Sequence, residues 1–179
     1  MTPPPSSAAA ADWGPPERAQ VALLADVGAA PKPGNVDRDH DHSDLRLGQF
    51  LAGGIGAGAG LRDAAAGDPV GAAFERAIAG MSRGAGTNTQ FGSLLLVVPL
   101  VRAAAAADRA LSPDGAAAVV ESTTVADAAA FYRAFEHVDV AVPDPPADMA
   151  DLDVRRGAGA IPTLEARGLT LYDVFSQNT

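Results

Sequence analysis

Apolar residues recur at intervals of three and four along most of this chain, a spacing that predicts helices rather than strands. Alternation of β-branched and other residues over four or more positions occurs only at 138–142, so we expect little or no sheet. The expected helices follow in order along the chain: 15–28, a segment capped by Ser43, 69–84, 93–110, a short helix from Ser112 and Pro113, one capped by Thr123 or Thr124, one after the connection 139–153, and a last one capped by Thr170. The pattern therefore predicts an all-α protein.

Two of these segments have an unusual composition. The run AGGIGAGAG at 52–60 carries five glycines, each costing a helix about 1 kcal/mol relative to alanine. Either the helix frays there or a neighbouring helix packs very close. The run LLLVVPLV at 94–101 is apolar on all sides, which predicts a buried central helix with a kink at Pro99.

The cap signals are more specific. Thr123 or Thr124 precedes an apolar run, and Asp127 stands near the position that completes a capping box. Asp68 and Pro69 suit the cap and first residue of the helix that ends at Gly84 to Gly86.

Size and composition indicate one domain. The 179 residues, 47% of them hydrophobic, suffice for a single core, and we expect one compact multi-helix domain over 15–179. The first fourteen residues, MTPPPSSAAAADWG, have the composition of a disordered leader.

The charge excludes some functions. The net charge is −9, with 17 Asp, five Glu and a single lysine, which disfavours a nucleic-acid interface. Such a surface suits concentrated salt, where screening is strong, so we expect a halophilic cytoplasm. Cysteine is absent, which excludes disulfides and thiolate ligands. No apolar run approaches the length of a membrane span, so we expect a soluble protein; homo-oligomerisation stays open.

The segment PKPGNVDRDHDHSD at 31–44 is the first candidate for chemistry. Charges about 4 Å apart repel by roughly 4 kcal/mol at an effective dielectric near 20, so four aspartates sharing a water-poor site require a cation. Carboxylates without thiolates favour Mg²⁺, which usually comes with substrate phosphates. Lys32 and Arg38 are placed to hold those phosphates, and a histidine or Asp37 could act as general base.

The alternative interpretation of this segment is an acidic loop that is merely solvated in brine. High salt makes such a loop inexpensive. Lys32 favours a functional role, because a chain that replaces lysine elsewhere keeps one beside Pro31, Pro33 and Gly34.

The second candidate is GAGTNTQFG at 84–92. It lacks the lysine and hydroxyl of a phosphate-binding P-loop, and GGIGAGAG fits no dinucleotide-binding fingerprint. A glycine-bounded turn before a helix N-terminus nevertheless offers amides and hydroxyls to an anion. Helix capping by Thr87, Asn88 or Thr89 is the competing interpretation.

Together the two segments resemble the N-terminal motifs of the triphosphoribosyl-dephospho-CoA synthase family. PKPGNVDR followed by His and Asp is similar to the family's K-P-G-x-V-D-R and its His/Asp cluster, and GTNTQFG is similar to its G-x-N-T-x-x-G. Their order and separation also agree. The resemblance implies an all-helical enzyme that uses ATP and dephospho-CoA and releases adenine.

The resemblance also implies roles for individual residues. By motif position it implies roles for Lys32, Asp37, Arg38, Asp41, Asp44 and Asn88. Together with the two histidines and the turn threonines, the expected catalytic residues are Asp37, His40 and His42, and the expected Mg²⁺ ligands are Asp41 and Asp44. The expected substrate-binding residues are Lys32, Arg38, Thr87, Asn88 and Thr89.

The chain also departs from the family pattern. The cluster after Arg38 is about two residues short, so either His40 or His42 corresponds to the family histidine. Members run longer and carry an Asn-Pro-Gly-type motif near their C-terminus, so we expect this chain to correspond to the N-terminal part of the family fold. Two alternatives stay open: a Mg²⁺-dependent nucleotide or phosphoester hydrolase that uses the same cluster, and a non-catalytic helical domain.

Overall fold

The computed structural model describes residues 12–106, 112–145 and 147–176. Most of the expected leader at 1–14 lies outside these residues. Within them the chain forms helices and no strand, so the all-α prediction is confirmed, and 138–142 is irregular. The α-helices are α2 (Pro15–Gly28), α3 (Leu47–Gly56), α4 (Gly58–Ala66), α5 (Val70–Ala85), α6 (Phe91–Ala106), α7 (Pro113–Glu121), α8 (Val125–Ala134), α9 (Ile161–Arg167) and α10 (Leu171–Ser176). Three 3₁₀ segments, η1 (Phe135–His137), η2 (Ala147–Leu152) and η3 (Val154–Ala160), connect α8 to α9.

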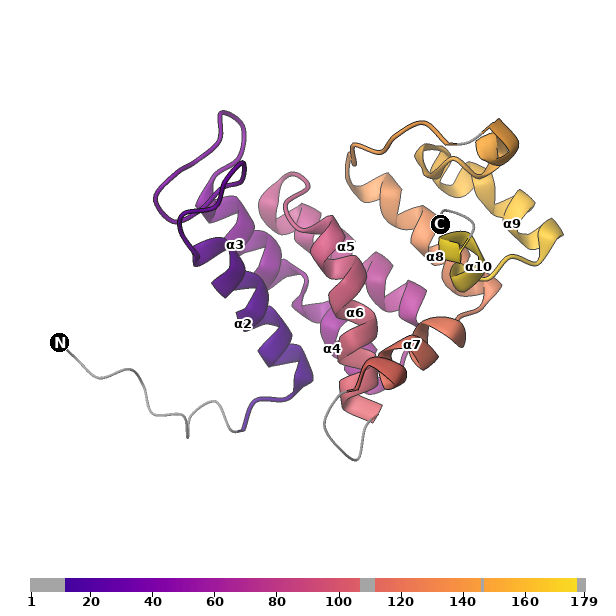
Figure 1. Ribbon diagram of the computed structural model, residues 1–179, viewed down its shortest axis with the longest axis horizontal. Coiled ribbons are helices and arrows are strands. Elements are labelled where there is room, and N and C mark those ends of the chain that lie inside the picture. Colours follow the sequence, from indigo (N-terminus) through magenta and orange to yellow (C-terminus); the bar gives the residue numbers. More distant parts are fainter. Residues whose placement is uncertain (1–11, 107–111, 146, 177–179) are drawn as a thin grey trace.

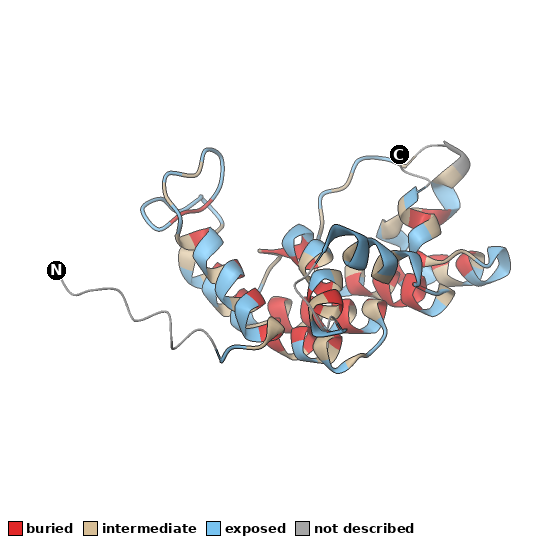
Figure 2. Cartoon of the chain, turned by 60° about the horizontal axis from the view of Figure 1, so that its bottom comes forward, coloured by how far each residue is buried: buried red, intermediate tan, exposed pale blue. Residues whose placement is uncertain are grey.

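Helix α5 lies at the centre of the molecule. It packs against α3 and α4 on one side and against α6 and α8 on the others (Figure 1). Its buried face carries Phe74, Ala77, Ile78 and Met81, which recur at helical spacing. Burial of this face explains why α5 organises the other helices around itself (Figure 2).

The glycine-rich run does not fray; a neighbour packs against it. Gly56 and Gly80 bring the backbones of α3 and α5 into contact, since a Cβ on Gly56 would lie 2.2 Å from the carbonyl oxygen of Gly80. A Cβ on Gly60 would likewise meet the carbonyl of Ala73. The single expected helix is divided at Ala57 into α3 and α4. Of the two alternatives given by the sequence, close packing is therefore correct.

Helix α6 is less buried than its sequence predicted. It spans Pro99 as expected, and Leu94, Val98 and Val101 are buried. Leu96, however, is 68% exposed, so the prediction of burial on all sides is wrong. Helices α2, α4, α5 and α7 pack against α6 but leave part of its surface open, and apolar character alone could not reveal this.

Some of the predicted helix caps are confirmed and others are wrong. Thr124 and Asp127 form the expected capping box on α8, Thr170 accepts from the Asp173 amide at the start of α10, and Ser112 caps α7. Ser43 does not cap α3. That helix begins at Leu47, after Arg46, because the Asp41 carboxylate accepts from the Leu47 amide. Helix α5 begins at Val70, with Pro69 as its cap residue rather than its first residue.

Aromatic side chains form the middle of the main core. Phe131 on α8 contacts Phe74, Tyr132, Phe135 and Phe175, with ring centroids 5.3 to 5.8 Å apart. These contacts join α5, α8 and α10 around one centre. In the part of the chain that the structure describes, no helix is both long enough and apolar enough to cross a bilayer.

Candidate functional site

The loop 29–46, between α2 and α3, is held in place by a small hydrophobic core of its own. Val36, in the middle of the loop, is fully buried between Val27 of α2 and Phe50 of α3, and Leu45 and Leu47 pack around them. This cluster is separate from the main core. The loop thus has a fixed attachment point directly before Asp37.

Asp37 is the best-connected polar residue of the loop. Its side chain is 2% exposed, and its carboxylate accepts hydrogen bonds from the backbone amides of Lys32, Asp39 and His40 at 2.8 to 2.9 Å. These bonds, first that from Lys32 and then that from Asp39, lower the pKa of Asp37 to about 2. The carboxylate therefore shapes the loop, and its low pKa makes it a weak proton acceptor at neutral pH.

The two histidines differ in their surroundings. His40 Nδ1 lies 3.1 Å from Asp37 Oδ1, and the imidazole is 73% exposed. The His42 amide donates to the Leu45 carbonyl at 2.9 Å, and its residue is exposed. Only His40 is thus oriented by a neighbouring carboxylate.

Two basic residues of the loop, Lys32 and Arg38, already contact acids. Lys32 Nζ lies 2.7 Å from Asp26 Oδ2, an acid in the last turn of α2. Arg38 Nε lies 3.4 Å from Asp39 Oδ2, and both of these side chains are largely exposed. Neither ion pair is buried, so each can exchange its carboxylate for another anion at small cost.

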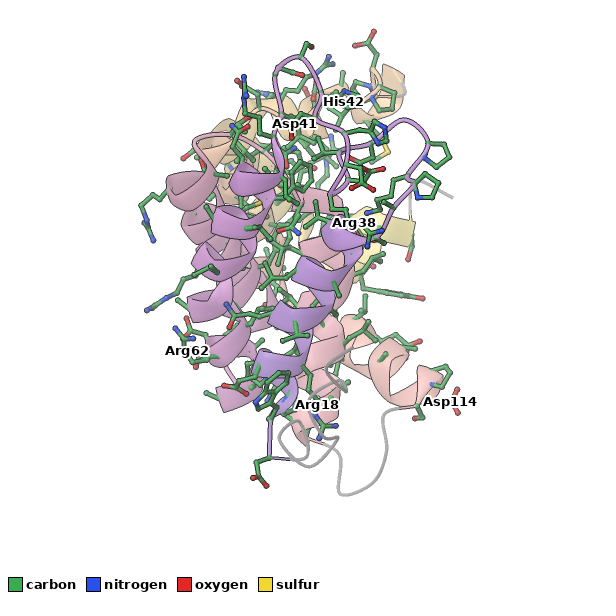
Figure 3. The ribbon with its side chains drawn as sticks, turned by 90° about the vertical axis from the view of Figure 1, so that its left-hand side faces the viewer. Arg18, Arg38, Asp41, His42, Arg62 and Asp114 are labelled. Carbon is green, nitrogen blue, oxygen red and sulfur yellow. The ribbon has the colours of Figure 1, made fainter. Side chains whose placement is uncertain are left out.

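The expected metal ligands, Asp41 and Asp44, each make a hydrogen bond within the loop or at the start of α3. Asp41 Oδ1 accepts from the Leu47 amide at 3.0 Å, and Asp44 Oδ1 accepts from Ser43 Oγ at 3.4 Å. Figure 3 shows Asp41, His42 and Arg38 at one end of the helical bundle, far from Arg18 and Asp114. Among the described residues no three His, Asp or Glu side chains are grouped closely enough to hold a metal ion.

The second motif forms the turn between α5 and α6. Gly86 ends α5 with φ 74°, a conformation that favours glycine. Asn88 Oδ1 accepts from the Phe91 amide at 3.2 Å, and Asn88 Nδ2 donates to the carbonyl of Asp139 at 3.4 Å. The helix-capping interpretation of Asn88 is therefore correct. Thr87 and Thr89 are half-buried on the same turn.

Two polar atoms of this turn are buried without a partner among the described residues. They are Thr89 Oγ1, which lies over Gly53, and Gln90 Oε1. A buried hydroxyl or amide oxygen without a hydrogen bond costs about 1–3 kcal/mol. The turn therefore keeps unused hydrogen-bonding capacity.

Both motifs lie at the same end of the bundle (Figure 1). Gln90 Nε2 donates to the Leu23 carbonyl of α2 at 3.1 Å, and Gln49 Nε2 donates to the Ala85 carbonyl of α5 at 3.4 Å. These bonds join the helix ends that carry the two motifs. The structure thus brings together the neighbourhoods of two segments about fifty residues apart.

A comparison with protein families identifies this arrangement. The family model described as CitG, ATP:dephospho-CoA triphosphoribosyl transferase, matches residues 13–179. The chain belongs to this transferase family. Comparisons with curated proteins and with solved structures return no match. The family resemblance of the two motifs is confirmed, and so is the prediction that the chain is an enzyme.

Sequence reasoning missed three contributors to this candidate site. Asp26 holds the sole lysine, Gln90 ties the second motif to α2, and the segment near Asp139 receives Asn88. Gln90 lies inside the second motif and could have been predicted, because a glutamine between Thr89 and an apolar helix is a candidate for a buried hydrogen bond to a neighbouring helix. Asp26 and Asp139 gave no signal, since their contacts depend on the tertiary fold.

Proposed function

We propose that this chain transfers the triphosphoribosyl group of Mg–ATP to the 2′-hydroxyl of dephospho-CoA and releases adenine. The observation that supports this proposal is the placement of both family motifs at one end of the bundle, where Gln49 and Gln90 tie them together. In the reaction the glycosidic C1′–N9 bond of ATP breaks, and a bond forms between C1′ and the acceptor oxygen. The acceptor hydroxyl loses its proton, and adenine takes one up.

Lys32, Arg38 and the turn of Thr87, Asn88 and Thr89 are the proposed triphosphate contacts. Lys32 and Arg38 each hold an exposed carboxylate that a phosphate can replace. The turn precedes the N-terminus of the sixteen-residue helix α6, where the backbone amides favour an anion. Thr89 Oγ1 has no partner among the described residues, but it is buried over Gly53, so it would reach a phosphate only after the turn shifts.

Magnesium enters this proposal as part of the substrate. A Mg²⁺ ion bound to a triphosphate needs only one or two protein carboxylates and keeps its other ligands as phosphate oxygens and water. Asp41 and Asp44 each use one carboxylate oxygen within the loop. Their second oxygens suit this limited role, and no preformed cluster is required.

His40 is the proposed proton acceptor for the 2′-hydroxyl. Asp37 contacts Nδ1 of the ring and so leaves Nε2 directed away from the loop, which is how a carboxylate orients a catalytic imidazole. Asp37 then acts as the positioning residue for His40, and its low pKa keeps it charged in this role. His42 is the matched comparison, because no carboxylate orients its ring among the described contacts.

The test of the proposed function is a magnesium-dependent assay for adenine release. Adenine should appear from Mg–ATP only when dephospho-CoA is present, and a mass spectrum should show the acceptor enlarged by the triphosphoribosyl group. Because we also propose a salt-adapted surface and a cytoplasmic location, the assay belongs at both low and molar salt. Adenine release without an acceptor would favour a hydrolase instead, and no release with any hydroxyl acceptor would overturn the proposal.

Replacement of the proposed base sharpens the same assay. His40→Gln should lower kcat by at least 100-fold with little change in the KM for ATP, as expected for a group that moves a proton in the rate-limiting step. His42→Gln, two residues away in the same loop, should retain most of the activity. The reverse result would assign the base to His42.

A further inference from the structure

An apolar cavity of about 510 Å³ lies beside the second motif, on the side of the molecule away from α2. Residues of α6 and α8 form its floor, and Val140, Val142 and residues 143–145, with Leu152 and Asp153, form its other wall. Its size falls within the roughly 300–1,000 Å³ of small-molecule sites. The residues that determine its character are Phe91, Phe131, Tyr132, Phe135, Val140 and Val142.

The cavity is directly connected to the second motif. Phe91, three residues after Asn88, lies in the cavity wall. Asn88 itself donates to the carbonyl of Asp139, the neighbour of Val140. Ser82 Oγ on α5 donates to the carbonyl of His137 at 2.6 Å, which fixes the start of the same segment. A ligand in the cavity would therefore touch a segment that the motif holds in place.

The irregular segment 138–145, which we term the strap, closes the cavity. Its far end is fastened by Arg155, whose guanidinium contacts Asp144 at 2.9 Å and Asp153 at 2.6 Å. The strap can be followed in Figure 1 as the connection that leaves the end of α8. Val140 and Val142 line the cavity while Ala141 between them is exposed, the alternation of an extended chain.

The chemistry of the cavity selects against the triphosphate. Its charged lining residues are Asp144 and Asp153, whose carboxylates both pair with Arg155, so the lining itself offers no cation to a polyphosphate. The strap offers a different kind of contact. Asp139 gives its carbonyl to Asn88, and Pro143 and Pro145 have no N–H. Within the described residues the backbone groups of Val140, Ala141 and Val142 make no backbone–backbone hydrogen bond outside helices, so they can pair with the amides of a ligand.

We propose that this cavity binds the pantetheine arm of the acceptor. The inference rests on the proposed function, because dephospho-CoA consists of a nucleotide and an uncharged arm with two amides, a dimethyl group and a terminal thiol. The dimethyl group and the methylenes suit the aromatic and aliphatic floor, and the two amides suit the unpaired backbone of the strap. The nucleotide end then lies toward Asn88, where the 2′-hydroxyl is required.

The experiment compares two ligands that differ only in the arm. The dissociation constants of dephospho-CoA and of ADP are measured by calorimetry with the wild-type chain, with Val142→Trp and with Ala141→Trp. Val142→Trp fills the cavity from the strap, whereas Ala141→Trp adds the same side chain on the exposed side. The wild-type chain and Ala141→Trp should bind dephospho-CoA at least tenfold more tightly than ADP. In Val142→Trp this ratio should fall to about one, while ADP binding is unchanged.

The ratio of the two dissociation constants in the wild-type chain tests the inference even if Val142→Trp fails to fold. Equal affinity of the wild-type chain for dephospho-CoA and ADP would overturn the inference, as would a Val142→Trp chain that keeps the full preference. Neither measurement involves turnover. If the chain binds dephospho-CoA more tightly than ADP but releases no adenine, the arm site is supported and the proposed function is not. If it releases adenine but binds the two ligands equally, the proposed function is supported and the arm site is not.

Discussion

Asp26 Oδ2 lies 2.7 Å from Lys32 Nζ, so the sole lysine of the chain is held by an acid of the preceding helix. Asp26 is 64% exposed, and pairs of this kind contribute about 0–1 kcal/mol to stability. Lys32→Ala should therefore barely change the melting temperature of the free chain, yet remove most of the rise that Mg–ATP produces. Thermal melting with and without Mg–ATP checks this.

Asp26→Asn is the matched control for that prediction. It breaks the same ion pair but leaves Lys32 charged and available to a phosphate. The variant should respond to Mg–ATP at least as strongly as the wild-type chain. Loss of the response in Asp26→Asn as well would mean that Asp26 positions Lys32 for the nucleotide rather than competing with it.

The low pKa of Asp37 predicts a specific pH dependence of stability. Its pKa is about 2 in the folded chain against an ordinary 3.8, because the carboxylate accepts the amides of Lys32 and Asp39. A lowered pKa stabilises the fold above the unfolded value, and this contribution is lost as the pH falls from about 4 through 2. Asp37→Asn should lower the melting temperature at pH 7 and weaken its decline between pH 4 and 2. Parallel melting curves for the two chains across this range would argue against the loop role of Asp37.

Asn88 allows capping to be separated from ligand binding. Asn88→Asp keeps an acceptor for the Phe91 amide, and a negative charge at a helix N-terminus is favourable by about 0.3–1 kcal/mol. The variant also loses the donation from Nδ2 to the Asp139 carbonyl, so it should melt near the wild-type temperature. It should lose its response to Mg–ATP, because the carboxylate repels phosphate. Asn88→Ala should lose about 1 kcal/mol of stability and the response together. An Asn88→Asp chain that still responds fully would leave Asn88 only its capping role.

The contact of Gly56 with Gly80 predicts a large stability loss far from the site. A Cβ on Gly56 would lie 2.2 Å from a backbone oxygen, which no side-chain movement relieves. Gly56→Ala should therefore cost roughly 3 kcal/mol by overpacking. Gly48, in the same helix, has open space around its Cβ position, and Gly48→Ala should gain up to about 1 kcal/mol. Denaturant unfolding compares the two, and similar values would contradict the packing argument.

The fold could be predicted from the sequence wherever the signal was local. The spacing and caps of α7, α8 and α10 depend on neighbouring residues such as Thr124 and Asp127, and these predictions held. The start of α3 depends on Asp41, six residues before Leu47, so Ser43 was the wrong cap. The exposure of Leu96 depends on which helices cover α6, and no local pattern carries that information.

The site could be predicted only as a set of motifs. The sequence identified the family and the two segments, and the assignment of individual roles to Asp41, Asp44 and the two histidines stays a prediction. The hydrogen bond from Gln90 to the Leu23 carbonyl and the ion pair between Asp26 and Lys32 depend on tertiary packing. The cavity beside Phe91 has the same origin, since α6 forms one part of its lining and α8 with the strap forms another.

The separate core of Val27, Val36 and Phe50 gives the loop 29–46 a stability of its own. A unit with few buried contacts opens at a lower free energy than the rest of a protein. The loop can therefore unfold locally and close again while α5 and the aromatic core stay intact. Such independent opening would let a bulky nucleotide enter and leave between turnovers, and amide hydrogen exchange would record it as faster exchange at Val36 than at Ile78.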